Sequence, residues 1–189
     1  LQSLFRDEQR KVLETILESS LLEAEALYRQ IYEQRAPIMR FLTDLNIPLL
    51  KGFSAAAEVV LNSDLRRALE RTAIDVQQVI KKIDTAKIEG VSLDSNILEF
   101  AFRHTFEHTA SRFAADPSLA ALRELQDTAD LLQYFPFPVN LWTIQNIFYG
   151  LLQKCYPAQR DAQMRGDETA HAWVSSFAEL ARKLGIKVS

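Results

Sequence analysis

The sequence is poor in the residues that form disulfides, break helices and span membranes. Among its 189 residues there are one cysteine, five glycines and six prolines. A single thiol, Cys155, excludes an intrachain disulfide framework and any zinc or iron–sulfur site built from several cysteines. Few glycines disfavour β-hairpins and βα loops, which use glycine where φ is positive. The apolar runs are short, which excludes a membrane-spanning helix.

An excess of charge of one sign is also missing. The formal net charge is −3, from 22 basic and 25 acidic residues. This balance argues against nonspecific binding to nucleic acid, which requires a concentrated basic surface. Apolar residues make up 48% of the chain, which is enough for a buried core and too much for a disordered segment. The chain begins at Leu1 without a signal-peptide pattern, so we expect a segment excised from a longer, cytoplasmic protein.

Helix-forming residues at helical spacing dominate what is present. Between Phe5 and Arg35 there is no glycine or proline, and apolar residues recur every three or four positions. No alternating pattern typical of a β-strand occurs. The sequence therefore predicts an all-α fold, with residues 1–189 in a single domain. We expect an irregular array of about eight helices with one long N-terminal helix. The apolar stripe of that first helix comprises Val12, Leu13, Ile16, Leu17, Leu21, Ala24, Tyr28 and Ile31.

Helix breakers and capping residues set the expected ends of the helices. Pro37 is expected to end the long helix because the residue before a proline avoids helical geometry, and a short second helix follows it. Asn62 or Ser63 is expected to cap a new helix. Asn140 is expected to cap another helix, which runs over Leu141–Tyr156.

One five-residue pattern could carry chemistry. His104-Thr105-Phe106-Glu107-His108 matches H-x-x-E-H, in which two histidines one turn apart bind zinc and the glutamate activates water. On a helix the two histidines share one face, and the apolar stripe lies on another side. The sequence singles out no third ligand, and two histidines on a solvated helix flank are the simpler interpretation. His104 and His108 are therefore weak metal-ligand candidates, a metal-dependent hydrolase ranks third among the functions, and no cofactor is assigned.

Aromatic and amide side chains alternate along the helix expected after Asn140. Trp142, Asn146, Tyr149 and Gln153 are three or four residues apart and so share a face. Rings stack on sugars or on partner side chains and amides bind hydroxyls, which makes this stripe a candidate interaction surface. The favoured alternative is that these residues pack in the core, with their amides paired to the irregular backbone of the neighbouring proline-rich turn.

Several segments, taken together, resemble a known family. The segments are SLFRDEQR at 3–10, ALYRQIYE at 26–33, APIMRFL at 36–42, LNSDLRRALE at 61–70 and FPFPVNLW at 135–142. They are similar to the C-terminal region of bacterial proteins related to glycoside hydrolase family 57, and the similarity covers essentially the whole chain in order. The sequence departs from that pattern at Pro138, where the family has an acidic residue.

The resemblance implies an accessory role in carbohydrate metabolism. In that family a barrel resembling polysaccharide hydrolases comes first, a domain of unknown function follows, and a helical segment comes last. The catalytic carboxylates would lie upstream, so no catalytic residue is assigned here and the chain alone is not expected to be an enzyme. We expect a non-catalytic helical domain that packs on or supports the barrel of the same polypeptide, with polysaccharide contacted through that parent. The alternative is a standalone protein–protein interaction module, a homo-oligomer through the long first helix.

Overall fold

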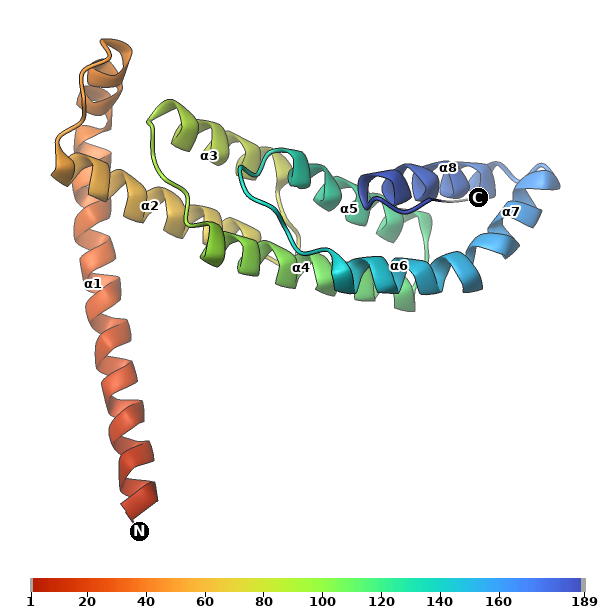
Figure 1. Cartoon of the computed structure of the whole chain (residues 1–189), viewed down its shortest axis with the longest axis horizontal. Coiled ribbons are helices and arrows are strands. Elements are labelled where there is room, and N and C mark those ends of the chain that lie inside the picture. Colours follow the sequence, from red (N-terminus) through yellow and green to blue (C-terminus); the bar gives the residue numbers. More distant parts are fainter. Residues whose placement is uncertain (1, 188–189) are drawn as a thin grey trace. The chain divides into compact units, whose positions relative to one another are not determined.

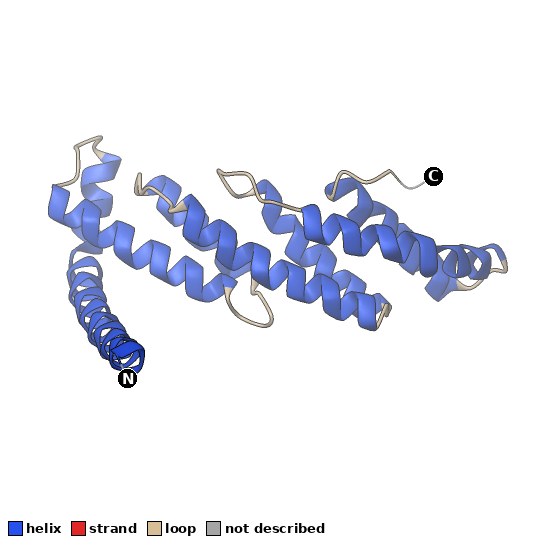
Figure 2. Ribbon diagram, turned by 60° about the horizontal axis from the view of Figure 1, so that its bottom comes forward, coloured by secondary structure: helices blue, strands red, loops and turns tan. Residues whose placement is uncertain are grey.

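The computed structural model describes residues 2–187, with side chains from Glu8 onward. Over these residues the protein is helical and contains no strand (Figure 2). The predicted all-α fold, with about eight helices and a long first one, is confirmed. The elements, labelled in Figure 1, are α1 (Gln2–Asp44), α2 (Lys51–Leu69), α3 (Val76–Ile88), α4 (Ser95–Ala115), α5 (Leu119–Asp130), the 3-10 turn η1 (Leu131–Gln133), α6 (Trp142–Lys154), α7 (Tyr156–Met164) and α8 (Glu168–Lys183).

The chain divides into two compact units. Leu1–Ser63 and Thr85–Leu93 form the first unit, and Asp64–Asp84 and Asp94–Ser189 form the second. Two of the three boundaries fall inside α2 and α3, each of which contributes to both units, and the third falls just before α4. The expectation of one domain over residues 1–189 stays a prediction, because it depends on whether the two units unfold together.

In the first unit, a buried carboxylate connects α1 to the segment after α3. The Tyr32 hydroxyl donates to Glu89, with the two carboxylate oxygens 3.1 and 2.9 Å away. Glu89 is buried, and a buried charge needs such partners because it has lost its water. In the same unit Asn62 Nδ2 donates to the carbonyl of Ser92 over 2.9 Å. These two polar contacts join segments that are far apart in the sequence.

The prediction that Pro37 ends the first helix is wrong, because α1 continues through it to Asp44. A proline inside a helix removes one hydrogen bond and crowds the preceding turn, at a cost of about 3 kcal/mol. Ala36 and Met39, on either side of it, are buried, and their packing stabilises this turn. The chain leaves the helix two residues after Asp44, at Asn46, whose φ is +55°. There the Ile47 N–H donates to the carbonyl of Leu42 over 2.8 Å, a Schellman arrangement.

The predicted boundary at Asn62 or Ser63 is also wrong, since both residues lie inside α2. The Asn62 amide donates to the carbonyl of Glu58, 2.8 Å away and one turn earlier. Its side chain therefore satisfies the backbone of its own helix rather than capping a new one. Leu61 and Leu65 on either side are buried, so apolar packing continues across the polar pair.

The second unit contains the larger core. Helix α4 packs against α5 and α6, α5 packs against α8, and α7 packs against both α6 and α8. The predicted apolar stripe of α4 is buried, and aromatic rings join the helices: the Phe148 and Phe177 centroids are 4.0 Å apart. The fully buried large side chains of this unit include Leu98, Phe102, Phe106, Phe113, Leu122, Leu125, Phe148 and Phe177.

The helix expected over Leu141–Tyr156 is two helices in the structure. Helix α6 ends at Lys154, and α7 begins at Tyr156 after a break at Cys155. A proline in the first turn of α7 favours this new start, because its fixed φ suits a helix N-terminus and its missing N–H has no intrahelical partner there. The prediction that Asn140 caps this helix is wrong by one position, because Leu141 is the N-cap of α6; Asn140 Oδ1 accepts from the Trp142 N–H over 3.0 Å just before the helix.

Candidate functional site

The four residues of the predicted stripe lie on one solvent-exposed face of α6. Trp142, Asn146, Tyr149 and Gln153 are all exposed, and the two rings keep 70% and 55% of their surface accessible. The favoured expectation that they pack in the core is therefore wrong. The core face of α6 is the other stripe, which contains Ile144, Phe148 and Leu151. A role of this face in binding stays a prediction.

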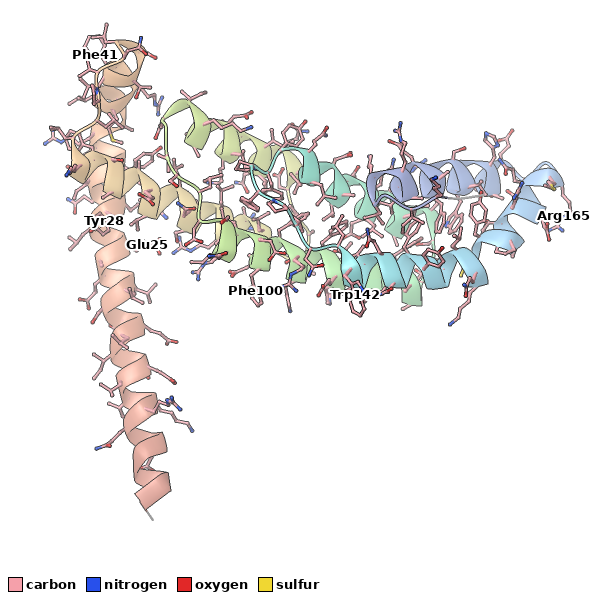
Figure 3. The ribbon with its side chains drawn as sticks, viewed as in Figure 1. Glu25, Tyr28, Phe41, Phe100, Trp142 and Arg165 are labelled. Carbon is pink, nitrogen blue, oxygen red and sulfur yellow. The ribbon has the colours of Figure 1, made fainter. Side chains whose placement is uncertain are left out.

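Helix α4 contributes two more exposed apolar side chains beside this face. Phe100 and Ile97 are 60% and 49% exposed, and Figure 3 shows Phe100 and Trp142 projecting below the ribbons of their helices. The Asn140 N–H donates to Glu99 Oε1 over 3.1 Å, which holds the start of α6 against the turn of α4 that carries Phe100. We refer to this region as the aromatic surface; its residues are Ile97, Phe100, Trp142, Asn146, Tyr149 and Gln153.

A guanidinium beside Phe100 pairs with two carboxylates. Arg103 Nε donates to Glu99 Oε1 over 3.0 Å, and another nitrogen of its guanidinium lies 3.6 Å from Glu107. The same guanidinium lies 5.5 Å from the centre of the Phe100 ring, within the range of a cation–π contact. Two carboxylates to one guanidinium leave a net negative charge beside the ring.

The two histidines of the H-x-x-E-H pattern lie on the exposed flank of α4. His104 stacks on Phe100, with ring centroids 6.3 Å apart, and His108 is exposed. Glu107 is engaged by Arg103. Among the residues described between 2 and 187, no group of three or more His, Cys, Asp or Glu side chains is placed to hold a metal ion. His104 therefore extends the aromatic surface, and the pattern lacks the further ligand that a zinc site needs.

A shallow hollow borders the aromatic surface on α4. It has a volume of about 350 Å³ and is lined by Glu70, Phe100, Ala101, His104 and Thr105. The exposure of Phe100 follows from helical spacing, because residues two positions apart point to nearly opposite sides of a helix and Leu98 and Phe102 are both buried. The hollow was missed because Glu70, which lines it from just beyond the end of α2, is distant in the sequence.

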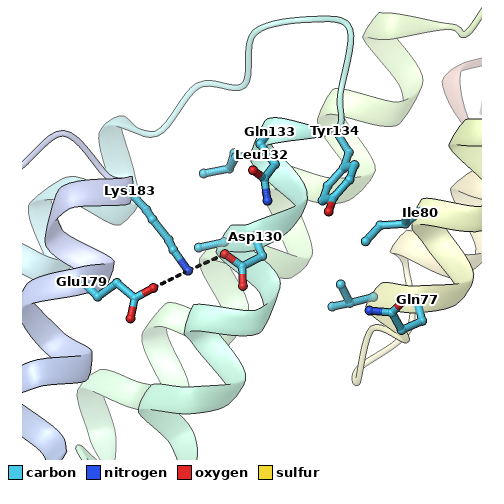
Figure 4. Close-up of a pocket in the computed structure, with 10 residues that line it drawn as sticks. Gln77, Ile80, Asp130, Leu132, Gln133, Tyr134, Glu179 and Lys183 are labelled. Atoms are coloured by element: carbon cyan, nitrogen blue, oxygen red, sulfur yellow. Dashed lines mark hydrogen bonds and ion pairs between the residues drawn. The ribbon is translucent and has the colours of Figure 1, made fainter.

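A larger hollow of about 610 Å³ lies between α3, α5, η1 and α8 (Figure 4). In it, Lys183 pairs with Asp130 and, over 3.3 Å, with Glu179. Partial burial lowers the pKa of Lys183, but the hydrogen bonds and charges of the two carboxylates outweigh burial and raise it. The amine therefore stays protonated at neutral pH and is unsuited to act as a base or nucleophile. This ion pair joins α5 to α8, and its partners are too far apart in the sequence to be predicted.

Comparison with protein-family models, curated proteins and solved structures gave no match. The expected similarity to proteins related to glycoside hydrolase family 57 stays a prediction from the five sequence segments quoted above. In the part of the chain that the structure describes, no helix is long and apolar enough to cross a membrane.

Proposed function

We propose that this chain is a non-catalytic helical domain of a cytoplasmic protein similar to glycoside hydrolase family 57. Its aromatic surface packs on the carbohydrate-active barrel expected upstream in the same polypeptide. The observation that supports this proposal is the exposure of three large rings, Phe100, Trp142 and Tyr149, on two helices that contact each other. Single exposed apolar residues are common on proteins, so the proposal depends on these rings of two neighbouring helices meeting the same partner.

The composition of the aromatic surface suits a protein partner. Tryptophan and tyrosine contribute most strongly to protein–protein binding, because they bury a large area at little cost in conformational entropy. The amides of Asn146 and Gln153 lie on the same exposed face of α6 and supply hydrogen-bonding groups beside the rings. Because Asn146 lies between the two rings along α6, a partner on this face would have to meet the amide as well as the rings.

The direct test is a calorimetric titration of the chain with the barrel, produced separately from the same reading frame. Binding is expected, and Trp142→Ala and Tyr149→Ala should each weaken it about tenfold or more, the loss typical of a central aromatic side chain. Met164→Ala is the matched control. Met164 is 73% exposed on α7 but lies outside the aromatic surface, so its removal should leave the affinity unchanged.

Three results would contradict the proposal. The first is a reading frame that encodes no barrel upstream of Leu1. The second is a barrel that does not bind the chain, or that binds the Trp142→Ala variant as tightly as the unaltered chain. The third is hydrolysis of α-glucan or mannan by the chain alone. Binding of soluble polysaccharide to the chain without the barrel would assign the aromatic surface to sugar instead.

A further inference from the structure

The hollow between α3, α5, η1 and α8 has the size of a small-molecule site. Its volume of about 610 Å³ falls within the range of roughly 300–1,000 Å³ that is usual for ligand pockets. All the residues that line it belong to the second unit, and none of them belongs to the aromatic surface. Because Lys183 lies at its edge in Figure 4, we refer to it as the Lys183 hollow.

The two sides of the Lys183 hollow differ in polarity. Helix α3 contributes the apolar side chains of Val76 and Ile80, whereas α8 contributes the charged side chains of Glu179 and Lys183. Asp130 of α5 lies between these two sides in Figure 4. A ligand that fills the hollow therefore needs an apolar body for one side and a charged or hydrogen-bonding head for the other.

Hydrogen-bond acceptors are in excess on the charged side. Lys183 Nζ donates to Asp130 Oδ1 and lies 3.3 Å from Glu179 Oε1, so each carboxylate has a second oxygen that this ion pair does not use. Two carboxylates and one ammonium leave one negative charge uncompensated. A head that carries donors and a positive charge is the complement of this side.

Two amides and an aromatic ring add further acceptors. Gln77 and Gln133 are exposed and Tyr134 is partly exposed. Among the lining residues drawn in Figure 4, the hydrogen bonds and ion pairs are those of Lys183, so the amides and the Tyr134 hydroxyl are not bound to one another. Amide and phenol oxygens accept from an ammonium group, which has only donors. The face of a tyrosine ring also attracts a cation.

A second hollow beside the first one selects against an anionic ligand. It has a volume of about 510 Å³ and shares Gln77 and Asp130 with the Lys183 hollow. Glu124 and Asp127 also line it. Arg112 neutralises Glu124, from which it lies 2.8 Å away, while Asp127 is exposed and adds negative charge. An anion approaching along this side is repelled, and a cation is attracted.

We propose that the Lys183 hollow binds a small primary amine with an aliphatic body. The ammonium head lies near the second oxygens of Asp130 and Glu179, and the body packs against Val76, Ile80 and Leu132. A sugar or another polyol fits less well, because it would leave these apolar side chains without an apolar partner. The inference does not rest on the proposed function, since the barrel and the aromatic surface play no part in it.

The first experiment is an NMR titration of the isotope-labelled chain with three probes that share a five-carbon body. They are pentylamine, pentanol and pentanoate, each added at neutral pH, where pentylamine is protonated. Pentylamine should shift the side-chain amide signals of Gln77 and Gln133 in a saturable way. Pentanol should bind about tenfold more weakly, because it lacks the charge that strengthens hydrogen bonds to carboxylates. Pentanoate should give no saturable shift.

The second experiment repeats the pentylamine titration with a pair of matched variants. Glu179→Gln keeps the size of the side chain but removes the uncompensated negative charge, and it should weaken binding about fivefold, as expected for a partly exposed ion pair. Glu168→Gln is the control. Glu168 lies in the first turn of the same helix and does not line the hollow, so the net charge changes equally while the affinity should stay the same. The side chain of Glu179 is 45% exposed, and circular dichroism checks that both variants fold.

Four outcomes overturn the proposal. Pentylamine that causes no saturable shift at Gln77 and Gln133 would show that the hollow binds no amine. Pentanol that binds as tightly as pentylamine would show that the apolar side acts alone. Equal weakening by both variants would show a general attraction of cations to an acidic chain. Saturable binding of pentanoate, or of glucose added as a polyol probe, in preference to pentylamine would assign the hollow to another class of ligand.

Discussion

At the scale of single residues, Asp167 shows how a side chain fixes a helix start. Its Oδ1 accepts from the backbone N–H groups of Thr169 and Ala170, over 2.9 and 3.2 Å, and from the Thr169 hydroxyl. The side-chain hydrogen bond from Thr169, followed by the N–H of Ala170, lowers the pKa of Asp167 below its ordinary value. The ionised form is therefore the one that stabilises the start of α8.

The lowered pKa predicts a pH-dependent loss in the Asp167→Ala variant. Folding stabilises the ionised form of Asp167, which is what a lowered pKa means. The contribution of this carboxylate to the stability of the folded state is therefore fully present above the unfolded pKa, at about 4. It is lost as the pH falls through the lower pKa of the folded state. At pH 7 the variant should therefore have a lower melting temperature than the unaltered chain, and the difference should shrink below about pH 4. Thermal unfolding followed by circular dichroism across this range measures it. A difference independent of pH would contradict the assignment.

Residues that terminate helices through backbone geometry were predictable from the sequence. Gly90 and Gly185 end α3 and α8 with φ of +64° and +73°, where a side chain would be strained. Asp94 caps α4 by accepting from the N–H groups of Asn96 and Ile97. Such ends depend on one residue and its nearest neighbours, so a sequence can indicate them. The hollow beside Phe100 was missed because Glu70, which lines it, is distant in the sequence.

At the scale of elements, Pro37 is a case in which tertiary packing overrides a local preference. The sequence predicts a break because the local cost of an internal proline is large, but the buried Ala36 and Met39 keep α1 continuous. The helix therefore carries a strain that substitution should relieve.

Pro37→Ala is expected to raise the free energy of unfolding by about 1–3 kcal/mol, because it restores a helical N–H donor and removes the clash with the preceding turn. Urea denaturation measures the change. Pro48, which follows the end of α1, provides the control. Pro48→Ala should destabilise the protein slightly, by about 0.4–1 kcal/mol, because its only effect is to increase the conformational entropy of the unfolded chain. A loss of stability in Pro37→Ala would show that the turn depends on the fixed φ of the proline.

The division between α6 and α7 could not be predicted from periodicity. Helix α7 has no buried residue, so its sequence lacks the apolar stripe by which amphipathic helices are recognised. Its place in the structure comes from its packing against α6 and α8. Helix α8, in contrast, buries Ala170, Trp173, Val174, Phe177 and Leu180, the stripe that its spacing predicts.

At the scale of the whole molecule, the proposed function is binding through an exposed surface. The sequence predicts which helices are amphipathic, and the second unit covers the apolar stripes of α4 and α8 as expected. Two apolar regions stay exposed, the face of α1 that carries Leu13, Leu17 and Leu27 and the aromatic surface. A periodic pattern shows that a face is apolar, but it does not show what covers that face. This is why the candidate surface on α6 was recognised while its exposure was not expected.

The most direct test of the central claim, that the aromatic surface is where the barrel packs, is acrylamide quenching of tryptophan fluorescence. The chain has two tryptophans. Trp142 is 70% exposed, and Trp173 is 2% exposed with its indole N–H bonded to the carbonyl of Pro117. The Trp142→Phe variant therefore isolates the buried ring, and subtracting its signal reports on Trp142. The account predicts strong quenching of Trp142 in the chain alone and a several-fold fall when the barrel is added to saturation. Equal quenching of Trp142 with and without bound barrel would contradict it.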